Sequence, residues 1–243
     1  MKNSTHVIET KSLSMSWDNK NILNNLNIRL HEGEKLAIVG PSGAGKSTIL
    51  KILAGLILPT EGELKIFGAK QNYLRLDQIN PPDVRLVFQN PALLGSLTIE
   101  ENVGFILYRS KKFTKKVIKE LVNECLEEVG LFNVSHKLPN ELSGGMQKRV
   151  SFARALINQS TNSLKNRPLL LFDEPTAGLD PIASSRIEDL INKTNTKVKG
   201  SSIVVSHVLS TIERTSEKVV ILYGGKFRWA GSIEEFKESN DPY

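Results

Sequence analysis

The chain has little cysteine and no long hydrophobic run, and these absences exclude several classes of protein. The single cysteine, Cys125, excludes an internal disulfide and a zinc site built from clustered cysteines. No apolar run approaches the roughly 18 to 20 residues that a membrane-spanning helix needs. The nearest run, residues 49–58, is short and is interrupted by Lys51. The N-terminal segment MKNSTHVIET has neither an apolar core nor a small-residue cleavage site, so we expect no secretory signal.

Composition bounds the size of the fold and the chemistry of its partners. With 243 residues, of which 40% are hydrophobic, the chain is long enough to bury a substantial core as one domain. The net charge of +6 permits nucleotide, nucleic acid or an anionic membrane surface as a partner and selects none of them. The basic run KKFTKK at 111–116 is most simply the solvated face at the start of a helix. Cys125 lies in an amphipathic run, so we expect a buried thiol in a reducing compartment, either cytosol or stroma.

A phosphate-binding loop is the clearest motif in the sequence. The apolar run LAIV at 36–39 is typical of a buried parallel strand, and GPSGAGKST follows it at once, before a helix over 49–55. This order of strand, loop and helix is that of the P-loop, whose backbone N–H groups wrap the phosphates of ATP. Lys46 would reach the β and γ phosphates, and the Ser47 hydroxyl would ligate Mg²⁺. The residues predicted to bind nucleotide here are Gly40, Pro41, Ser42, Gly43, Ala44, Gly45, Lys46, Ser47 and Thr48.

Two adjacent carboxylates follow a second buried strand. The segment PLLLFDE at 168–174 gives four apolar residues and then two acids. Asp173 would lie beside the P-loop and hold Mg²⁺ through a water. Because adjacent positions at a strand end point in different directions, Glu174 would face the γ phosphate and orient the attacking water as a general base. The alternative is that both acids only begin the turn before Pro175.

Two further strands bring polar side chains to the same edge of the predicted sheet. The run SIVVS at 202–206 delivers His207 to the carboxyl end, where ligands gather in open α/β sheets. We interpret His207 as a sensor of the γ phosphate, although a lone histidine is usually structural. Gln89 closes the strand VRLVF at 84–88, and its side chain would reach Mg²⁺ and the attacking water.

A second candidate anion site lies at the start of a helix near residue 146. Ser143, Gly144 and Gly145 precede apolar residues at helical spacing, and a helix N-terminus favours an anion, most often phosphate. The simpler alternative is an ordinary N-cap. Since the P-loop already encloses the phosphates of one nucleotide, the economical arrangement is a head-to-tail homodimer. In it, each chain lends its serine and two glycines to the ATP held by the other.

Taken in order, GPSGAGKST, Gln89, LSGGM, LLLFDE, AGLD at 177–180 and His207 resemble the nucleotide-binding subunit of ABC transporters. The resemblance implies that Ser143, Gly144 and Gly145 form the signature motif, that Asp180 belongs to the D-loop at the dimer interface, and that Trp17 stacks on adenine. It also implies an α/β fold: a RecA-like P-loop NTPase core with an N-terminal antiparallel β subdomain. A helical subdomain over about 92–158 would be inserted into this single domain of residues 1–243. Our coarse secondary-structure prediction agrees, with strands near 6–13, 26–30 and 62–67 and helices near 114–129 and 146–157.

Three longer segments are similar to the lipid-transport ATPases that work with MCE-domain proteins, the Mla and trigalactosyldiacylglycerol-type group. They are residues 87–107, residues 138–156 with 173–184, and residues 226–243. The polar insertion NQSTNSLKNR at 158–167 favours the cyanobacterial and plastid branch. The tail residues Phe236, Ser239 and Pro242 match that group, whose chains usually continue beyond the position of Tyr243.

The resemblance implies an ATPase that uses ATP and Mg²⁺ and lies peripherally on the cytoplasmic or stromal face of a membrane. Its partners would be a second copy of the chain, a separate transmembrane permease and an MCE-domain protein, with no nucleic acid. We expect the permease to bind near Gln89 and the apolar stretch 92–107. Two alternatives stay open, and the first of them would use the same site residues. One is the ATPase of another ABC transporter, such as an amino acid importer or a lipoprotein exporter, and the other is a soluble ABC ATPase such as an iron–sulfur scaffold subunit.

Overall fold

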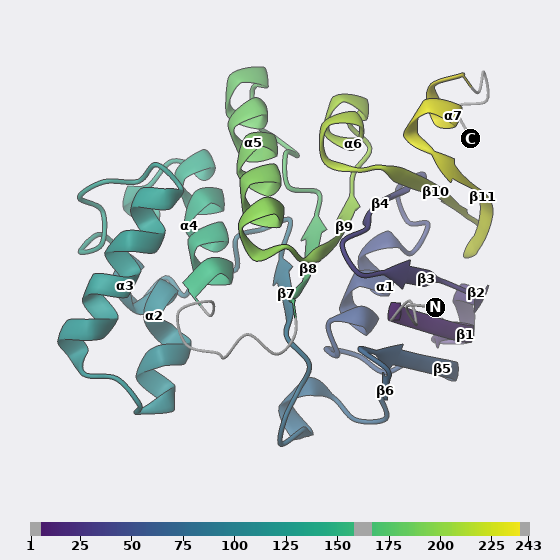
Figure 1. Cartoon of the computed structure of the whole chain (residues 1–243), viewed down its shortest axis with the longest axis horizontal. Helices are drawn as coiled ribbons and strands as arrows, with labels where there is room; N and C mark the ends of the chain where they lie inside the picture. The colour runs from purple at the N-terminus through teal and green to yellow at the C-terminus, as the bar shows by residue number, and fades with distance from the viewer. Residues whose placement is uncertain (1–5, 158–166, 239–243) are drawn as a thin grey trace. The chain divides into compact units, whose positions relative to one another are not determined.

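The computed structural model describes residues 6–157 and 167–238, and these form two compact units (Figure 1). The first unit falls within Met1–Leu86, Asn166–Glu174 and Asn195–Tyr243, and the second within Val87–Lys165 and Pro175–Thr194. The prediction of one ABC ATPase domain over 1–243, with a helical subdomain near 92–158, stays a prediction.

The P-loop and the two carboxylates lie at the ends of strands that belong to one six-stranded sheet. Its order is β11-β10-β4-β9-β8-β7, in which β10, β4, β9 and β8 are parallel and β11 is antiparallel. The strands are β4 (Lys35–Val39), β7 (Val84–Val87), β8 (Leu169–Asp173), β9 (Ser201–Val205), β10 (Lys218–Tyr223) and β11 (Lys226–Ser232). Every residue of β8 and β9 is buried, which explains why their sequences do not alternate between apolar and exposed polar side chains. The predicted strands at 36–39, 84–88, 168–174 and 202–206 are confirmed.

The N-terminal part of the first unit is a second, antiparallel sheet. Its order is β2-β1-β5-β6, and β3 also pairs with β1. The strands are β1 (His6–Trp17), β2 (Lys20–Leu26), β3 (Arg29–His31), β5 (Glu61–Ile66) and β6 (Ala69–Lys70).

The prediction of one strand over 26–30 is wrong, because β2 ends at Leu26 and β3 begins at Arg29. The side chain of Thr10 on β1 occupies the break. Its Oγ1 donates to the carbonyl of Leu26 at 3.0 Å and accepts from the N–H of Ile28 at 2.7 Å. A hydroxyl has taken over backbone hydrogen bonds that a continuous ladder would have made.

The core of the first unit is one apolar cluster shared by its sheets and α1 (Lys46–Leu53). Leu13 and Leu30 enter it from the antiparallel sheet, Ile49 from α1, and Leu171 and Ile203 from the parallel strands. A smaller cluster joins β4 and β10 to α6 (Leu209–Thr215) and α7 (Ile233–Glu238). Each of these large aliphatic side chains contributes roughly 1.5–3 kcal/mol on burial.

The second unit is helical, and α2 (Ile99–Ser110), α3 (Lys115–Glu128) and α4 (Gly144–Leu156) pack against one another (Figure 1). The helix α5 (Pro181–Val198) begins in this unit and continues into the first. Thr98 and Glu101 form a capping box at the start of α2, and Thr114 caps α3. The thiol of Cys125 on α3 is buried, as predicted. Among the described residues, no helix combines the length and apolar character that crossing a bilayer requires.

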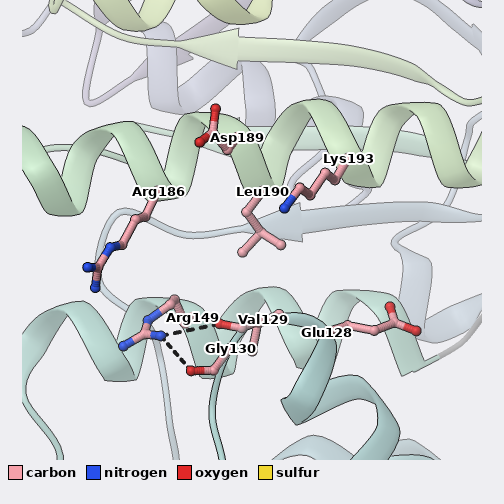
Figure 2. Close-up of a pocket in the computed structure, with 8 residues that line it drawn as sticks. All are labelled: Glu128, Val129, Gly130, Arg149, Arg186, Asp189, Leu190 and Lys193. Atoms are coloured by element: carbon pink, nitrogen blue, oxygen red, sulfur yellow. Dashed lines mark hydrogen bonds between the residues drawn. The ribbon is translucent and has the colours of Figure 1, made fainter.

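One arginine on α4 closes the C-terminal end of α3. The guanidinium of Arg149 donates to the carbonyls of Val129 and Gly130 at 3.3 and 2.8 Å, and this group borders an open hollow of about 300 Å³ in the second unit (Figure 2). Burial lowers the pKa of Arg149, and the nearby positive charge of Arg186 on α5 lowers it further. The position of α4, which carries the proposed signature residues, is therefore tied to that of α3.

The hydrogen bonds of the Thr10 hydroxyl at the break between β2 and β3 can be tested by mutation. We expect Thr10→Val to reduce the free energy of unfolding by about 1–3 kcal/mol, because the buried N–H of Ile28 would lose its acceptor. Urea unfolding followed by circular dichroism measures the change. Thr60→Val is the matched control, since Thr60 Oγ1 makes a single exposed hydrogen bond to the Ser14 carbonyl. Equal losses in the two variants would contradict the role assigned to Thr10.

Candidate functional site

The P-loop connects β4 to α1 in the first unit. Residues 40–45 form the loop, and Lys46, Ser47 and Thr48 make the first turn of the helix. Gly45 is the N-cap at φ 100°, in the left-handed region that favours glycine. The ammonium of Lys46 donates to the carbonyls of Gly40 and Pro41, at 2.8 and 2.9 Å. The side chain of Lys46 thus lies across the loop, and α1 begins where the loop ends. The ammonium group and the N–H groups at the start of the helix both suit a phosphate chain.

Ser47 and Asp173 are brought together from distant parts of the sequence. The Ser47 hydroxyl donates to Asp173 Oδ1 at 3.0 Å. Burial raises the pKa of the Asp173 carboxyl, the hydrogen bond from Ser47 opposes that rise, and the neighbouring Glu174 charge adds to it. Hydroxyl and carboxylate oxygens are the ligands that Mg²⁺ prefers.

The surroundings also fit a cation held together with substrate phosphates. Within residues 6–157 and 167–238, no group of three or more His, Cys, Asp or Glu side chains could hold a metal by itself. Mg²⁺ is commonly bound by one or two protein oxygens plus phosphate oxygens, rather than by a cage of protein ligands. The Ser47 and Asp173 pair has that character.

Glu174 follows the last residue of β8 and leaves the extended conformation of that strand. Its φ is +46°, unusual for a residue other than glycine, and its N–H donates to the carbonyl of Val205 at the end of β9. The buried carboxylate contacts His207, with Oε2 2.9 Å from the ring Nδ1. Two adjacent acids therefore serve different neighbours, Asp173 with Ser47 and Glu174 with His207. A strained backbone at such a residue is common in functional sites.

Four of the other predicted site residues, Ser143, Gly144, Gly145 and Asp180, belong to the second unit. Ser143 is the N-cap of α4, and its Oγ accepts from the N–H of Met146 at 3.3 Å. Gly144 and Gly145 form the first turn of that helix. Asp180 has the same local role for α5, since its Oδ1 accepts from the N–H groups of Ile182 and Ala183 at 3.0 and 2.9 Å. The ordinary capping role that the sequence left open is therefore present, and binding of phosphate at Ser143 stays a prediction.

Trp17 and Gln89 lie at the ends of strands. Trp17 ends β1 and is 60% exposed, so it does not belong to the core. Gln89 lies two residues beyond the end of β7 and is exposed. Both side chains are available to a ligand, and their roles toward adenine and Mg²⁺ stay predictions.

Sequence reasoning missed Lys148, a buried charged residue on α4. Its ammonium donates to the carbonyl oxygens of Pro175 and Ala177, at 3.3 and 2.5 Å. The sequence does indicate that Lys148 faces the core, because it lies one helical turn before Phe152, which is buried. A lysine on the buried face of a helix needs polar partners.

Comparison with known proteins shows the family of this chain. The model of the ABC transporter family matches residues 23–177, which include the P-loop, the signature residues and both carboxylates. The chain belongs to the ABC transporter family.

Two relatives match this ABC transporter subunit over nearly all of its length. It is 45% identical to the chloroplastic protein TRIGALACTOSYLDIACYLGLYCEROL 3 of Arabidopsis thaliana, over 97% of this chain and 71% of that protein. It is 33% identical to the intermembrane phospholipid transport system ATP-binding protein MlaF of Haemophilus influenzae, over 97% of this chain and 88% of MlaF.

A solved structure gives the same fold. The dimeric post-hydrolysis state of the ATP-binding cassette MJ0796, bound to ADP and Pi, superposes with a TM-score of 0.82. It is 32% identical and covers 93% of this chain and 98% of its own. The predicted α/β fold class of an ABC ATPase is confirmed, and the chain is an ATP-binding, ATP-hydrolysing subunit of an ABC transporter. Residues 158–166 of the predicted insertion at 158–167 lie outside the described residues, as do the tail residues Ser239, Pro242 and Tyr243.

The raised pKa of Asp173 predicts a pH-dependent stability. A carboxyl whose pKa is higher in the folded state than its ordinary 3.8 destabilises the fold once it ionises. We expect Asp173→Asn, measured by urea unfolding without nucleotide or metal, to be more stable than the parent at pH 8. Because Asn keeps an oxygen that can accept from Ser47, the variants should differ little near pH 4, and the gap should widen as the pH rises through the raised pKa. If the difference in free energy of unfolding stays constant or narrows as the pH rises, ionisation of the buried Asp173 carboxyl does not destabilise the fold.

Proposed function

We propose that this ABC transporter subunit is the Mg²⁺-dependent ATPase that energises transport of a phospholipid or glycolipid. The observation that carries the ATPase mechanism is the pair of contacts in the first unit, Ser47 with Asp173 and Glu174 with His207. Support for a lipid substrate comes from the two relatives above, because one is named for phospholipid transport and the other for a glycolipid.

In this proposal, the nine residues from Gly40 to Thr48 hold the phosphates, and Trp17 stacks on the adenine ring. The N–H groups of the loop and the start of α1 supply the donors, and Lys46 would exchange its two loop carbonyls for phosphate oxygens. Ser47, Asp173 and Gln89 are the proposed metal-binding residues. Bound Mg²⁺ would neutralise charge that develops on the β and γ phosphates.

Glu174, His207 and Gln89 are the proposed catalytic residues. Glu174 accepts a hydrogen bond from the attacking water, which it orients toward the γ phosphate and from which it takes a proton. The contact with His207 fixes the direction of that carboxylate. With a proton on both ring nitrogens, the exposed histidine would also donate its Nε2–H to a γ phosphate oxygen. Gln89 would orient the same water.

The signature residues would complete the site of a second chain. Ser143 keeps its hydroxyl hydrogen free to donate, since its oxygen is the acceptor for Met146. Ser143, Gly144 and Gly145 would therefore bind the γ phosphate of the partner's ATP in a homodimer, with Asp180 at the interface. The similar MJ0796 cassette, which is dimeric and bound to ADP and Pi, supports this arrangement.

A separate permease is the proposed membrane partner. Leu94, Phe105 and Ile106 are large apolar side chains in or beside α2, and each is 44–49% exposed. They lie in the unit that contains Gln89 and within the predicted contact stretch 92–107. The subunit would bind the permease at the cytoplasmic or stromal face of a membrane, with an MCE-domain protein as the lipid-binding partner and without nucleic acid.

The assigned general base gives a direct test of the catalytic mechanism. We expect Glu174→Gln to lower kcat for ATP hydrolysis by about 10²- to 10⁴-fold, because the amide cannot take the proton of the attacking water. The Kd for a fluorescent ATP analogue should stay close to that of the parent. Glu234→Gln, a surface change on α7, is the control and should leave kcat unchanged. Parent-like turnover in Glu174→Gln would refute the assigned role.

Capture of membrane partners tests the substrate class. The Glu174→Gln protein, purified from its native membranes with Mg²⁺ and ATP, should carry a multispan permease and an MCE-domain protein identified by mass spectrometry. Adding Phe105→Ser should reduce the recovered permease at least about tenfold, since a buried aromatic anchor can contribute several kcal/mol. Val117→Ser removes an exposed apolar side chain from α3 instead and should not reduce it.

Three outcomes would revise the proposal. A permease with a soluble solute-binding protein would replace lipid transport by import of a small solute. Soluble partners alone would favour a non-transport ABC ATPase. Equal recovery with Phe105→Ser would remove α2 from the permease contact.

A further inference from the structure

Lys148 carries its charge into the interior of the second unit. The residue is 9% exposed, and its ammonium donates to the carbonyls of Pro175 and Ala177. Burial of an ammonium is unfavourable unless polar atoms replace the lost water. The two carbonyls are such atoms, and both belong to the segment that directly follows Glu174.

That segment, residues 175–180, has little regular structure of its own. It forms turns, with Gly178 at φ +74° and a hydrogen bond from the N–H of Leu179 to the carbonyl of Thr176. It connects the proposed general base Glu174 to Asp180, the N-cap of α5. The two bonds from Lys148 therefore join this turn segment to a regular helix.

A second contact joins the same two parts of the chain. A side-chain methyl of Leu179 lies 3.8 Å from the place where a β-carbon on Gly145 would be. Leu179 thus packs beside the first turn of α4, the turn that holds the signature glycines. Lys148 and Leu179 fasten the two ends of the segment to the same helix.

We infer that Lys148 is a positioning residue that couples the two ATP sites of the dimer, an inference that rests on the proposed function. The ATP on the P-loop of one chain is attacked by water that Glu174 of that chain orients, and residues 175–177 follow Glu174 directly. Ser143, Gly144 and Gly145 of the same chain bind the partner's ATP. A shift of residues 175–177 when one ATP is hydrolysed would move Lys148 and α4, and so the signature residues at the other site.

The test compares Lys148→Met with Lys148→Arg in the full chain. Methionine keeps an unbranched side chain, one atom shorter, that cannot donate, whereas arginine keeps the charge and the donors. We expect Lys148→Met to lower kcat about 10- to 100-fold, the effect of losing charged hydrogen bonds that hold a catalytic segment. The Hill coefficient for ATP should fall toward 1, since coupling between two sites is what raises it. Lys148→Arg should restore both values, and the Kd of each variant for the fluorescent ATP analogue should match the parent.

A destabilised control separates coupling from general loss of structure. Val122→Ala removes buried methyl groups from α3 in the same unit. Its thermal midpoint is compared with that of Lys148→Met, and it should retain the parent Hill coefficient even if it is the less stable variant.

Different outcomes would refute the coupling by Lys148 and the proposed ATPase mechanism. Parent-like kcat and Hill coefficient in Lys148→Met would overturn the coupling, and so would an equal fall of the Hill coefficient in Val122→Ala. Failure of the parent itself to hydrolyse ATP would refute the proposed mechanism instead.

Discussion

The parallel pairing of β4, β9 and β8 is the constraint on which the ATP site depends. Because these strands run in one direction, their carboxyl ends meet at one edge of the sheet. The P-loop leaves the end of β4, the two acids leave β8, and His207 follows β9. Residues more than a hundred positions apart in the sequence, such as Ser47 and Asp173, thereby come within hydrogen-bond distance.

Placing two carboxylates side by side in a buried place has an electrostatic cost. Burial and the Glu174 charge both raise the pKa of Asp173, so the fold is destabilised when that carboxyl ionises. The left-handed backbone of Glu174 reduces the conflict by directing the second acid to His207, away from Ser47. The strain and the buried charge are both located where a cation and phosphates would bind, a common place for a protein to tolerate them.

In the second unit, the residues proposed to act on ATP also have ordinary structural roles. Ser143 caps α4 and Asp180 caps α5, so replacing either residue would affect both a helix terminus and a proposed phosphate or dimer contact. Lys148, on the same helix as Ser143, donates to two carbonyls of the segment that leads to Asp180. The link between the signature helix and the segment that leads to Asp180 therefore includes two hydrogen bonds from the Lys148 ammonium to backbone carbonyls.

The sequence by itself determined the buried strands, the P-loop, the two acids and the helix predicted near 114–129, because each has a local pattern of apolar spacing, glycines or caps. It could not determine the break between β2 and β3, since the hydroxyl that makes it comes from Thr10 on another strand. The sequence predicted that Asp173 and Glu174 point in different directions, but it could not determine the left-handed torsion of Glu174 or its contact with His207, which comes from the segment after β9. In the local sequence, Lys148 resembles any other polar residue of an amphipathic helix. Only the tertiary structure decided that it is buried, because the carbonyls that stabilise its charge belong to a turn nearly thirty residues later.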